Sequence, residues 1–319
     1  MKKYTYNSIL KTEIENYTDL RTAQGHSAKE NATLFSLDLY LQKEKPVEKP
    51  LSPIIVDGWV SSLPKNLHAN TKIVYISHYS GFAKYLNSIG IPAFIPERPG
   101  GEDTYIPYIF SHDEVKRLIA AADNMISTKK LALQFPLIIR LLYGCGMRAG
   151  EALGLKMMDV DLNDGIIIIR HGKGSKDRYV PLTTELKDIL KQYINIMKKE
   201  PFSDQWVFAN TKNNRHSTEW VRQKFNRCLE AAKIDKPSLQ RYSRNICPHC
   251  LRHSFAVHSF KKQGHLGIDM YTAAPLLAAY MGHSTFRDTE YYLRLTDEIG
   301  QEIVAKSINY ANVFPEVPQ

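Results

Sequence analysis

The stretch Cys247-Pro-His-Cys-Leu-Arg-His-Ser-Phe-Ala256 decides how the rest of the chain is interpreted. It places His249 three residues before Arg252, at the start of a segment with a helical pattern, so both side chains lie on one helical face. The planar guanidinium of arginine suits phosphate, and histidine can exchange a proton near neutral pH. Taken alone, the pair is equally compatible with a polar surface at a capped helix start, so the remainder of the chain has to distinguish the two.

The composition is that of a globular protein with room for two domains. The chain has 319 residues, of which 43% are hydrophobic and 24% charged. The sequence contains no run of 18 apolar residues, which is about the length that spans a membrane. The N-terminus lacks the apolar centre of a signal peptide. Four cysteines do not make a secreted disulfide framework, so we expect a cytoplasmic, reduced setting.

The charge of the chain favours a polyanionic partner. The formal net charge is +9, and residues 1–105 carry 12 basic against 11 acidic side chains. The other 30 basic and 22 acidic side chains put most of the excess in the C-terminal two thirds. Nucleic acid is the common polyanion, although a basic balance is also found in proteins that bind none.

Apolar periodicity and proline content predict the domain organisation. Apolar residues recur at helical spacing over residues 8–24, 32–43, 53–63 and 70–89, so residues 1–95 are predicted to form a small bundle of about four helices. Residues 96–107 are rich in proline and glycine and are predicted to be a linker. Residues 108–319 form the second predicted domain.

The second domain is predicted to be mainly α with a small β-sheet. Ser111 and Glu114 form a capping box that opens a helix, and the apolar residues 135–143 predict a buried helix. Residues 165–170 and 177–182 are strand-like runs that flank a glycine-rich turn, which predicts a hairpin. Further helices are predicted over 183–199, over 218–232, from about 275 and over 299–309.

Six polar residues along this domain suit one reaction class. Arginines stabilise the extra charge on a phosphodiester under attack, a general acid protonates the leaving oxygen, and an activated tyrosine can form a covalent intermediate. The candidates, in chain order, are Arg148, Lys173, His249, Arg252, His283 and Tyr292. Side chains could supply every cation and acid, so no metal and no cofactor are expected.

The chain closely resembles the tyrosine recombinase (phage integrase) family over roughly residues 8–300. Four segments carry the resemblance, together with Tyr292, which lies nine residues after His283. The segments are Gly146-Met-Arg-Ala-Gly-Glu-Ala-Leu-Gly-Leu155, Gly172-Lys-Gly-Ser-Lys-Asp-Arg-Tyr-Val-Pro-Leu182, His249-Cys-Leu-Arg-His-Ser-Phe-Ala256 and Met281-Gly-His283. Each is weak alone, but their order and spacing together are specific.

The resemblance implies a role for each candidate. Arg148 and Arg252 would clamp the scissile phosphate, and His283 would be a second phosphate-contacting histidine. Lys173 would be the general acid for the 5′-oxygen, and His249 the acid or base partner of the nucleophile. Tyr292 would be the nucleophile that forms a 3′-phosphotyrosine, which stores the bond energy, so that religation needs no ATP.

Supporting and competing residues accompany these candidates. Glu151 and His253 match family positions that support the site rather than do chemistry. Lys176 competes with Lys173 as the general acid and is better suited to a DNA-backbone contact. Tyr291 competes with Tyr292, but adjacent residues face different directions, so only one of them can reach the phosphate.

Two departures from the family pattern stand out. Cys250 replaces a residue that is commonly acidic, and Cys247-x-x-Cys250 with His249 and His253 nearby raises the possibility of zinc. The set falls short of four ligands at zinc spacing, so no metal site is predicted. The 31-residue interval from Arg252 to His283 is longer than usual, and we expect a loop around residues 261–272 with a partner-specific role.

The family implies a partner and an assembly. Residues 1–95 would be a core-binding, DNA-binding domain and residues 108–319 the catalytic domain, and the two would close as a clamp around double-stranded DNA. The assembly would be a homotetramer on two duplexes, with residues 299–319 docking on a neighbouring protomer through Phe314. The chain is expected to be too short for a further arm-binding domain, which favours a mobile-element integrase or a Xer-type chromosome or plasmid dimer resolvase. Rivals are a monomeric relaxase related to type IB topoisomerases and a catalytically silent DNA-binding regulator.

Overall fold

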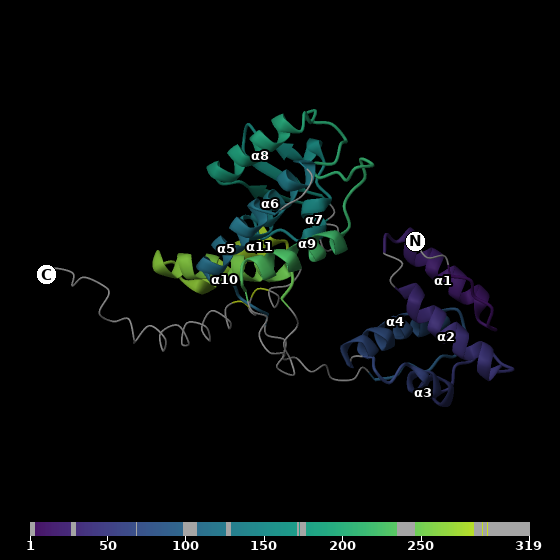
Figure 1. The fold of residues 1–319 in the computed structure, drawn as a ribbon. Coiled ribbons are helices and arrows are strands. Elements are labelled where there is room, and N and C mark those ends of the chain that lie inside the picture. The colour runs from purple at the N-terminus through teal and green to yellow at the C-terminus, as the bar shows by residue number, and fades with distance from the viewer. Residues whose placement is uncertain are drawn as a thin grey trace. The chain divides into compact units, whose positions relative to one another are not determined.

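The computed structural model describes residues 4–26, 30–67, 69–97, 107–125, 129–170, 172, 177–234, 246–283, 289 and 292. The chain divides into two compact units, Met1–Asp103 and Thr104–Gln319 (Figure 1). Within the described part, no helix is both long and apolar enough to cross a membrane. Most of the predicted linker, the tip of the predicted hairpin and the predicted docking segment lie outside the described residues.

The described part of the first unit contains four helices, at the places where apolar periodicity predicts them. They are α1 (Lys11–Ala23), α2 (Asn31–Glu44), α3 (Pro53–Ser62) and α4 (Ala69–Ser88). Trp59 and Tyr79 meet at the centre of their shared core, with ring centroids 5.3 Å apart. Ser52 caps α3 by accepting a hydrogen bond from the Ile55 amide, and proline follows it at the first helical position.

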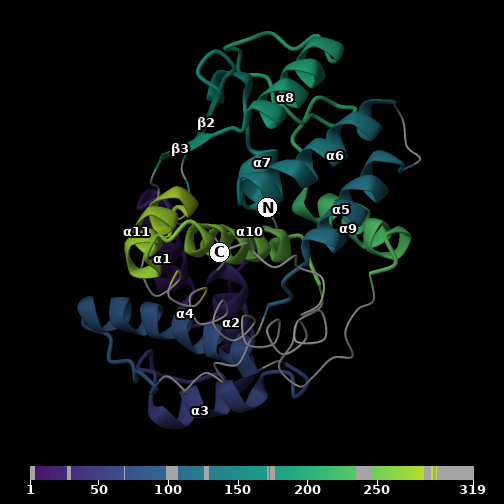
Figure 2. The same cartoon turned by 90° about the vertical axis from the view of Figure 1, so that its left-hand side faces the viewer.

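The helices of the second unit pack around a large apolar core. They are α5 (His112–Asp123), α6 (Lys129–Gly144), α7 (Ala149–Leu153), α8 (Thr184–Ile196), α9 (Thr218–Ala231), α10 (His249–His265) and α11 (Met270–Met281), with a short 3₁₀ turn at Met157–Asp159. A smaller apolar cluster lies between α10 and α11. Both bonds of the predicted capping box form: the Glu114 amide donates to the Ser111 hydroxyl, and the Ser111 amide donates to the Glu114 carboxylate. The buried helix α6 packs against α5, α8 and α10 (Figure 2).

A three-stranded antiparallel sheet completes the second unit, so the predicted fold class, mainly α with a small sheet, is confirmed. Strand β1 (Val160–Asp161) pairs with β2 (Ile166–Ile169), which pairs with β3 (Arg178–Pro181). Ile169 pairs with Arg178 at the turn end of the β2–β3 hairpin. Residues 173–176, which join the strands there and include Lys173, are not described.

Two predictions about the segment after Arg252 are wrong. The expected loop around 261–272 is largely helical, because α10 continues to His265 and only a short turn separates it from α11. Helix α11 starts at Met270 rather than near Pro275, since the Asp269 carboxylate accepts a hydrogen bond from the Thr272 amide and caps the helix earlier. Pro275 is accommodated inside the helix.

Two glycines let the chain turn tightly beside Arg252. Gly146 lies in the turn before α7 and has a φ of +58°, and Gly282 caps the C-terminus of α11 with a φ of +65°. Left-handed backbone of this kind is costly for residues that carry a Cβ. A Cβ on Gly146 would also lie 2.4 Å from Cδ1 of Phe255. Both the backbone conformation and this clash therefore disfavour any residue other than glycine at this position.

We therefore expect Gly146→Ala to destabilise the second unit by roughly 1–3 kcal/mol, since it adds both backbone strain and a clash. Gly264→Ala is the matched control, because Gly264 lies inside α10 and a Cβ there meets nothing within 4 Å. That substitution should leave stability unchanged or raise it by up to about 1 kcal/mol. Urea unfolding midpoints measure both, and equal effects would contradict the packing described here.

Candidate active site

Arg148 and Glu151 hold each other at the start of α7. The Arg148 amide donates to Oε2 of Glu151 at 2.9 Å, and the Arg148 guanidinium donates to Oε1 at 2.8 Å. This pairing follows from the sequence, because residues three apart at a helix start can cap one another. The Arg148 side chain remains partly exposed, so its guanidinium can meet a ligand.

Arg252 is the most deeply buried of the candidate residues that the structure describes. It projects from α10 and is 1% exposed. Nη1 donates to the carbonyl of Gly146 and Nη2 to the carbonyl of Met281, both at 2.6 Å. These bonds tie α10 to the turn before α7 and to the end of α11, and they use two of the five N–H groups of a guanidinium.

Arg178 is a third guanidinium in the cluster and was missed as a site residue by sequence reasoning. Its Nη1 and Nη2 donate to the two carboxylate oxygens of Glu151 at 3.0 and 2.7 Å, and its Nε donates to the Tyr280 carbonyl at 3.0 Å. It lies on β3 at the end of the hairpin that carries Lys173. Arg178 therefore connects that hairpin to α7 and α11.

Glu151 is the carboxylate that these three guanidinium groups share. Its Oε2 also lies 4.0 Å from Nη1 of Arg252. Burial alone would raise the pKa of Glu151, but hydrogen bonds from Arg178 and Arg148 outweigh it and lower the pKa to about 2. The residue is therefore ionised at neutral pH, and its single negative charge faces three positive ones.

The surplus of positive charge affects the pKa of Arg252. Burial, and then repulsion by Arg148, lowers the pKa of Arg252 to about 10, while Glu151 raises it. The guanidinium stays charged at neutral pH, yet it is under-compensated. An anion placed between Arg148 and Arg252 would relieve this repulsion, which is what a phosphate site requires.

A hydrogen bond with a histidine connects Tyr292 to this cluster. Its hydroxyl is 2.8 Å from Nδ1 of His253, and the residue is 4% exposed. The ring of His253 meets that of His249 edge-on, with centroids 4.6 Å apart. Arg252 is close enough to Tyr292 for a phenolate to favour its charged form.

Two histidines of this cluster, His253 and His249, are held neutral. Burial, followed by repulsion from His249 and Arg252, lowers the pKa of His253 to about 3. Loss of solvation, followed by repulsion from Arg252 and Arg148, lowers the pKa of His249 to about 4, although His249 still reaches solvent at the start of α10. A neutral imidazole has one acceptor nitrogen, so either histidine can accept a hydrogen bond from a hydroxyl.

His283 follows the end of α11. Its Nδ1 is 2.7 Å from the hydroxyl of Thr289, and its ring stacks on that of Tyr292 at a centroid distance of 5.9 Å. Thr289 is fully buried and was not identified from the sequence. It lies six residues after His283, and no sequence motif marks that contact.

The structure thus brings together five of the six candidates and both supporting residues. Arg148, Arg252, His249, His283 and Tyr292 are connected through the contacts above, with Glu151 and His253 between them. Lys173, its competitor Lys176 and the competing Tyr291 lie outside the described residues. The signal that could have identified Arg178 is its place in the motif that follows Lys173.

The cysteine pair lies at the edge of this cluster. The sulfurs of Cys247 and Cys250 are 4.0 Å apart, and Cys250 is buried. In the described part of the chain, no group of three or more histidine, cysteine, aspartate or glutamate side chains is arranged to hold a metal ion.

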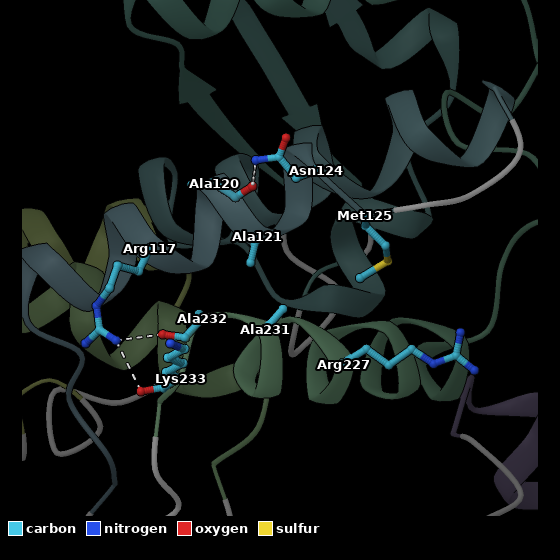
Figure 3. Close-up of a pocket in the computed structure, with 9 residues that line it drawn as sticks. All are labelled: Arg117, Ala120, Ala121, Asn124, Met125, Arg227, Ala231, Ala232 and Lys233. Carbon is cyan, nitrogen blue, oxygen red and sulfur yellow. Dashed lines mark hydrogen bonds between the residues drawn. The ribbon is translucent and has the colours of Figure 1, made fainter.

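A hollow of about 650 Å³ lies elsewhere in the second unit, between α5 and α9 (Figure 3). Arg117 reaches across it and donates to the carbonyls of Ala232 and Lys233. Its lining consists of Arg117, Ala120, Ala121, Asn124, Met125, Arg227, Ala231, Ala232 and Lys233. None of the candidate residues lines it, so it is separate from the candidate active site.

Comparison with known families identifies the second unit. Residues 109–298, more than half of the chain, match the phage integrase family. The chain belongs to this family. The resemblance inferred from the motifs is therefore confirmed.

Relatives within the phage integrase family include recombinases of archaea and bacteria. A tyrosine recombinase XerA of Pyrococcus horikoshii is 30% identical over 207 residues, covering 63% of this chain and 62% of that protein, which is less than two thirds of its length. A tyrosine recombinase of Thermosipho africanus is 30% identical over 241 residues, covering 73% of this chain and 74% of that protein.

A solved structure has a similar fold over most of the chain. The fold is similar to that of a XerH site-specific recombinase bound to palindromic difH substrate in a post-cleavage complex. The TM-score is 0.65 at 21% identity, and the match covers 86% of this chain and 77% of that one.

The ionised Glu151 should make the protein sensitive to acid. Its pKa in the folded state is about 2, below the roughly 4.3 of an unfolded glutamate. The ionised carboxylate therefore adds on the order of 3 kcal/mol to the free energy of unfolding above about pH 4.3. This contribution is lost as the pH falls towards 2. Urea midpoints measured from pH 5 to pH 2 should fall steeply for the wild type.

Glu151→Gln removes the titrating group and provides the comparison. The variant should be less stable at neutral pH by roughly 3–5 kcal/mol, because buried guanidinium groups lose their counter-charge. Its stability should change less between pH 5 and 2 than that of the wild type. The same slope in both proteins would show that Glu151 is not held ionised by Arg178 and Arg148.

Proposed function

We propose that this chain is a site-specific recombinase that cuts and rejoins duplex DNA through a covalent bond between Tyr292 and a 3′-phosphate. The observation that carries the proposal is the excess of positive charge around Glu151, next to the hydroxyl of Tyr292. Family membership and the relatives named as recombinases support it.

The reaction follows from what a phosphodiester needs. The Tyr292 oxygen attacks phosphorus and the 5′-oxygen departs, so negative charge on the non-bridging oxygens increases in the transition state. Arg148 and Arg252 supply the compensating charge, and Arg178 keeps Glu151 in place between them without contacting the phosphate. Religation reverses the step, so the chain needs no ATP.

Two protons have to move during cleavage. With Nδ1 of His253 unprotonated, Tyr292 donates its hydrogen bond to this nitrogen, which orients the phenol. The negative charge of a bound phosphate favours the charged imidazolium and so assists transfer of the phenol proton to His253. His249, packed against His253, is the second candidate for this transfer. Lys173 is proposed to protonate the departing 5′-oxygen, and His283 to contact the phosphate from the Tyr292 side.

Substrate access requires movement. Tyr292 is 4% exposed and Arg252 is 1% exposed, so a DNA phosphate cannot touch either group in the arrangement described. DNA binding therefore has to displace the Tyr292 side chain while Arg252 keeps its bonds to Gly146 and Met281. This fits a nucleophile that is held back until the substrate is bound.

The partner is double-stranded DNA, and the proposed assembly is a homotetramer on two duplexes that exchanges strands in pairs. Residues 1–95 would add contacts from a second domain, and residues 299–319 would dock on the neighbouring protomer. We favour integration or excision of a mobile element, with a Xer-type dimer resolvase as the alternative. Inverted repeats or transposon genes in the DNA beside the gene would separate the two.

A silent DNA-binding regulator on the same fold is the rival from another class. It would have no use for a neutral histidine 2.8 Å from a tyrosine hydroxyl beside two charged arginines. Covalent attachment to DNA separates the two functions directly.

Tyr292→Phe should abolish covalent attachment to a nicked duplex that carries the crossover site, while binding to this duplex persists. The substitution removes only the attacking oxygen. Denaturing gel electrophoresis detects the protein–DNA adduct, and a mobility-shift assay measures binding. Tyr291→Phe is the matched control and should attach like the wild type.

Attachment by the Tyr292→Phe variant together with its loss in Tyr291→Phe would move the nucleophile to Tyr291. No attachment by any of the three proteins, with tight binding by all, would favour the silent regulator.

DNA binding should weaken steeply with salt, because phosphate contacts release counterions. If Arg148 contacts one phosphate, Arg148→Gln should reduce the slope of log K against log salt by about one. Arg140→Gln is the control, since both Nη groups of Arg140 bind the Asp123 carboxylate on the neighbouring helix. Equal slopes for the wild type and Arg148→Gln would argue against the phosphate contact.

A further inference from the structure

Two cysteines, Cys247 and Cys250, flank His249 in the sequence at the start of α10. The Cys250 amide donates to the Cys247 carbonyl at 2.9 Å, which closes a tight turn and holds the two α-carbons near each other. The sulfurs are 4.0 Å apart, so the thiols are within hydrogen-bonding distance but are not joined by a disulfide. Because such a turn brings α-carbons within the range that disulfides use, a bond between the sulfurs requires only side-chain rotation and a small backbone adjustment.

The surroundings of the pair suit thiol chemistry. Cys247 is half-buried and precedes a 17-residue helix, where helix dipole and amide groups favour a thiolate. The pKa of Cys250 is raised, first by its hydrogen bond with Cys247 and then by burial. Cys250 therefore keeps its proton and can donate it to the Cys247 sulfur. Cys-x-x-Cys at a helix start is the arrangement that redox dithiols use.

The two other cysteines of the chain lack these features. Cys145 and Cys228 are both buried, and burial raises the pKa of each to about 12. They provide an internal reference for thiol reactivity within the same protein.

We infer that Cys247 and Cys250 form a redox-active dithiol whose oxidation to a disulfide switches off the active site at His249. The effect on DNA cleavage rests on the proposed recombinase function. Formation of the disulfide does not.

The oxidant is a small-molecule disulfide. The Cys247 thiolate attacks one of its sulfurs, forming a mixed disulfide and releasing one thiolate. Cys250 then loses its proton and attacks the Cys247 sulfur, which releases the second thiolate and closes the intramolecular bond. Two protein thiols are oxidised, and one small disulfide is reduced to two thiols. Dithiothreitol reverses the exchange.

The bond would act on catalysis through position. It closes a ring that contains Pro248 and His249, so the backbone of His249 has to adjust as the sulfurs move from 4.0 Å to about 2.05 Å. The His249 ring packs on His253, which binds the Tyr292 hydroxyl. Shifts of about an ångström in such a constellation can cost roughly a hundredfold in rate.

The test oxidises the full-length protein with glutathione disulfide and analyses it by mass spectrometry after alkylation. We expect one Cys247–Cys250 disulfide, with Cys145 and Cys228 unmodified, and full reversal by dithiothreitol. In the nicked-duplex assay, the oxidised protein should cleave at least about tenfold more slowly than the reduced protein. Reduced Cys247→Ser and Cys250→Ala should cleave at wild-type rates and should not respond to the oxidant by forming an intramolecular disulfide.

Each outcome bears on a separate part of the inference. If Cys247 and Cys250 react no faster than Cys145 and Cys228, or end only as mixed disulfides with glutathione, the dithiol is refuted. If the disulfide forms but cleavage is unchanged, its control of His249 is refuted. If the reduced wild type itself does not cleave DNA, the proposed function fails, while the disulfide measurement still decides the dithiol.

Discussion

The second unit depends on one carboxylate placed among three guanidinium groups. Glu151 accepts hydrogen bonds from Arg148 and Arg178 and lies 4.0 Å from Arg252. It thereby connects α7, the β2–β3 hairpin and α10, which come from distant parts of the sequence. Its single charge is enough to hold the arginines together but not to neutralise them, and the remaining positive charge is what a phosphate can satisfy.

The same imbalance accounts for the state of the neighbouring groups. Arg252 keeps its charge at neutral pH even though burial and Arg148 lower its pKa. His249 and His253 lose their protons for similar reasons, which leaves an acceptor nitrogen available beside Tyr292. One electrostatic arrangement therefore prepares both the proposed phosphate clamp and the proposed partner of the nucleophile.

Sequence reasoning reached most of the fold because local signals dominate there. Apolar periodicity located the helices of the first unit, and the capping box at Ser111 located the start of α5. The start of α11 was misplaced because Pro275 was taken as a boundary, although Asp269 caps the helix earlier. Strand β1 has only two residues and exists through its pairing with β2, so no local pattern could reveal it.

The site was predicted less completely, since its connections are non-local. The candidates were found through motifs, but the bonds from Arg178 to Glu151 and Tyr280 join residues far apart in the chain. The contact between His253 and Tyr292 likewise spans 39 positions. A sequence shows which residue types are present, whereas their distances emerge only when α7, α10, α11 and β3 pack together.

The most direct measurement is a crystal structure of the Tyr292→Phe variant bound to an intact duplex that carries its crossover site. We predict one backbone phosphate within hydrogen-bonding distance of both Arg148 and Arg252, with Glu151 still bound to Arg178 and the substituted ring at position 292 directed at that phosphorus. DNA bound on a surface that leaves Arg148 and Arg252 without a shared phosphate would contradict the account.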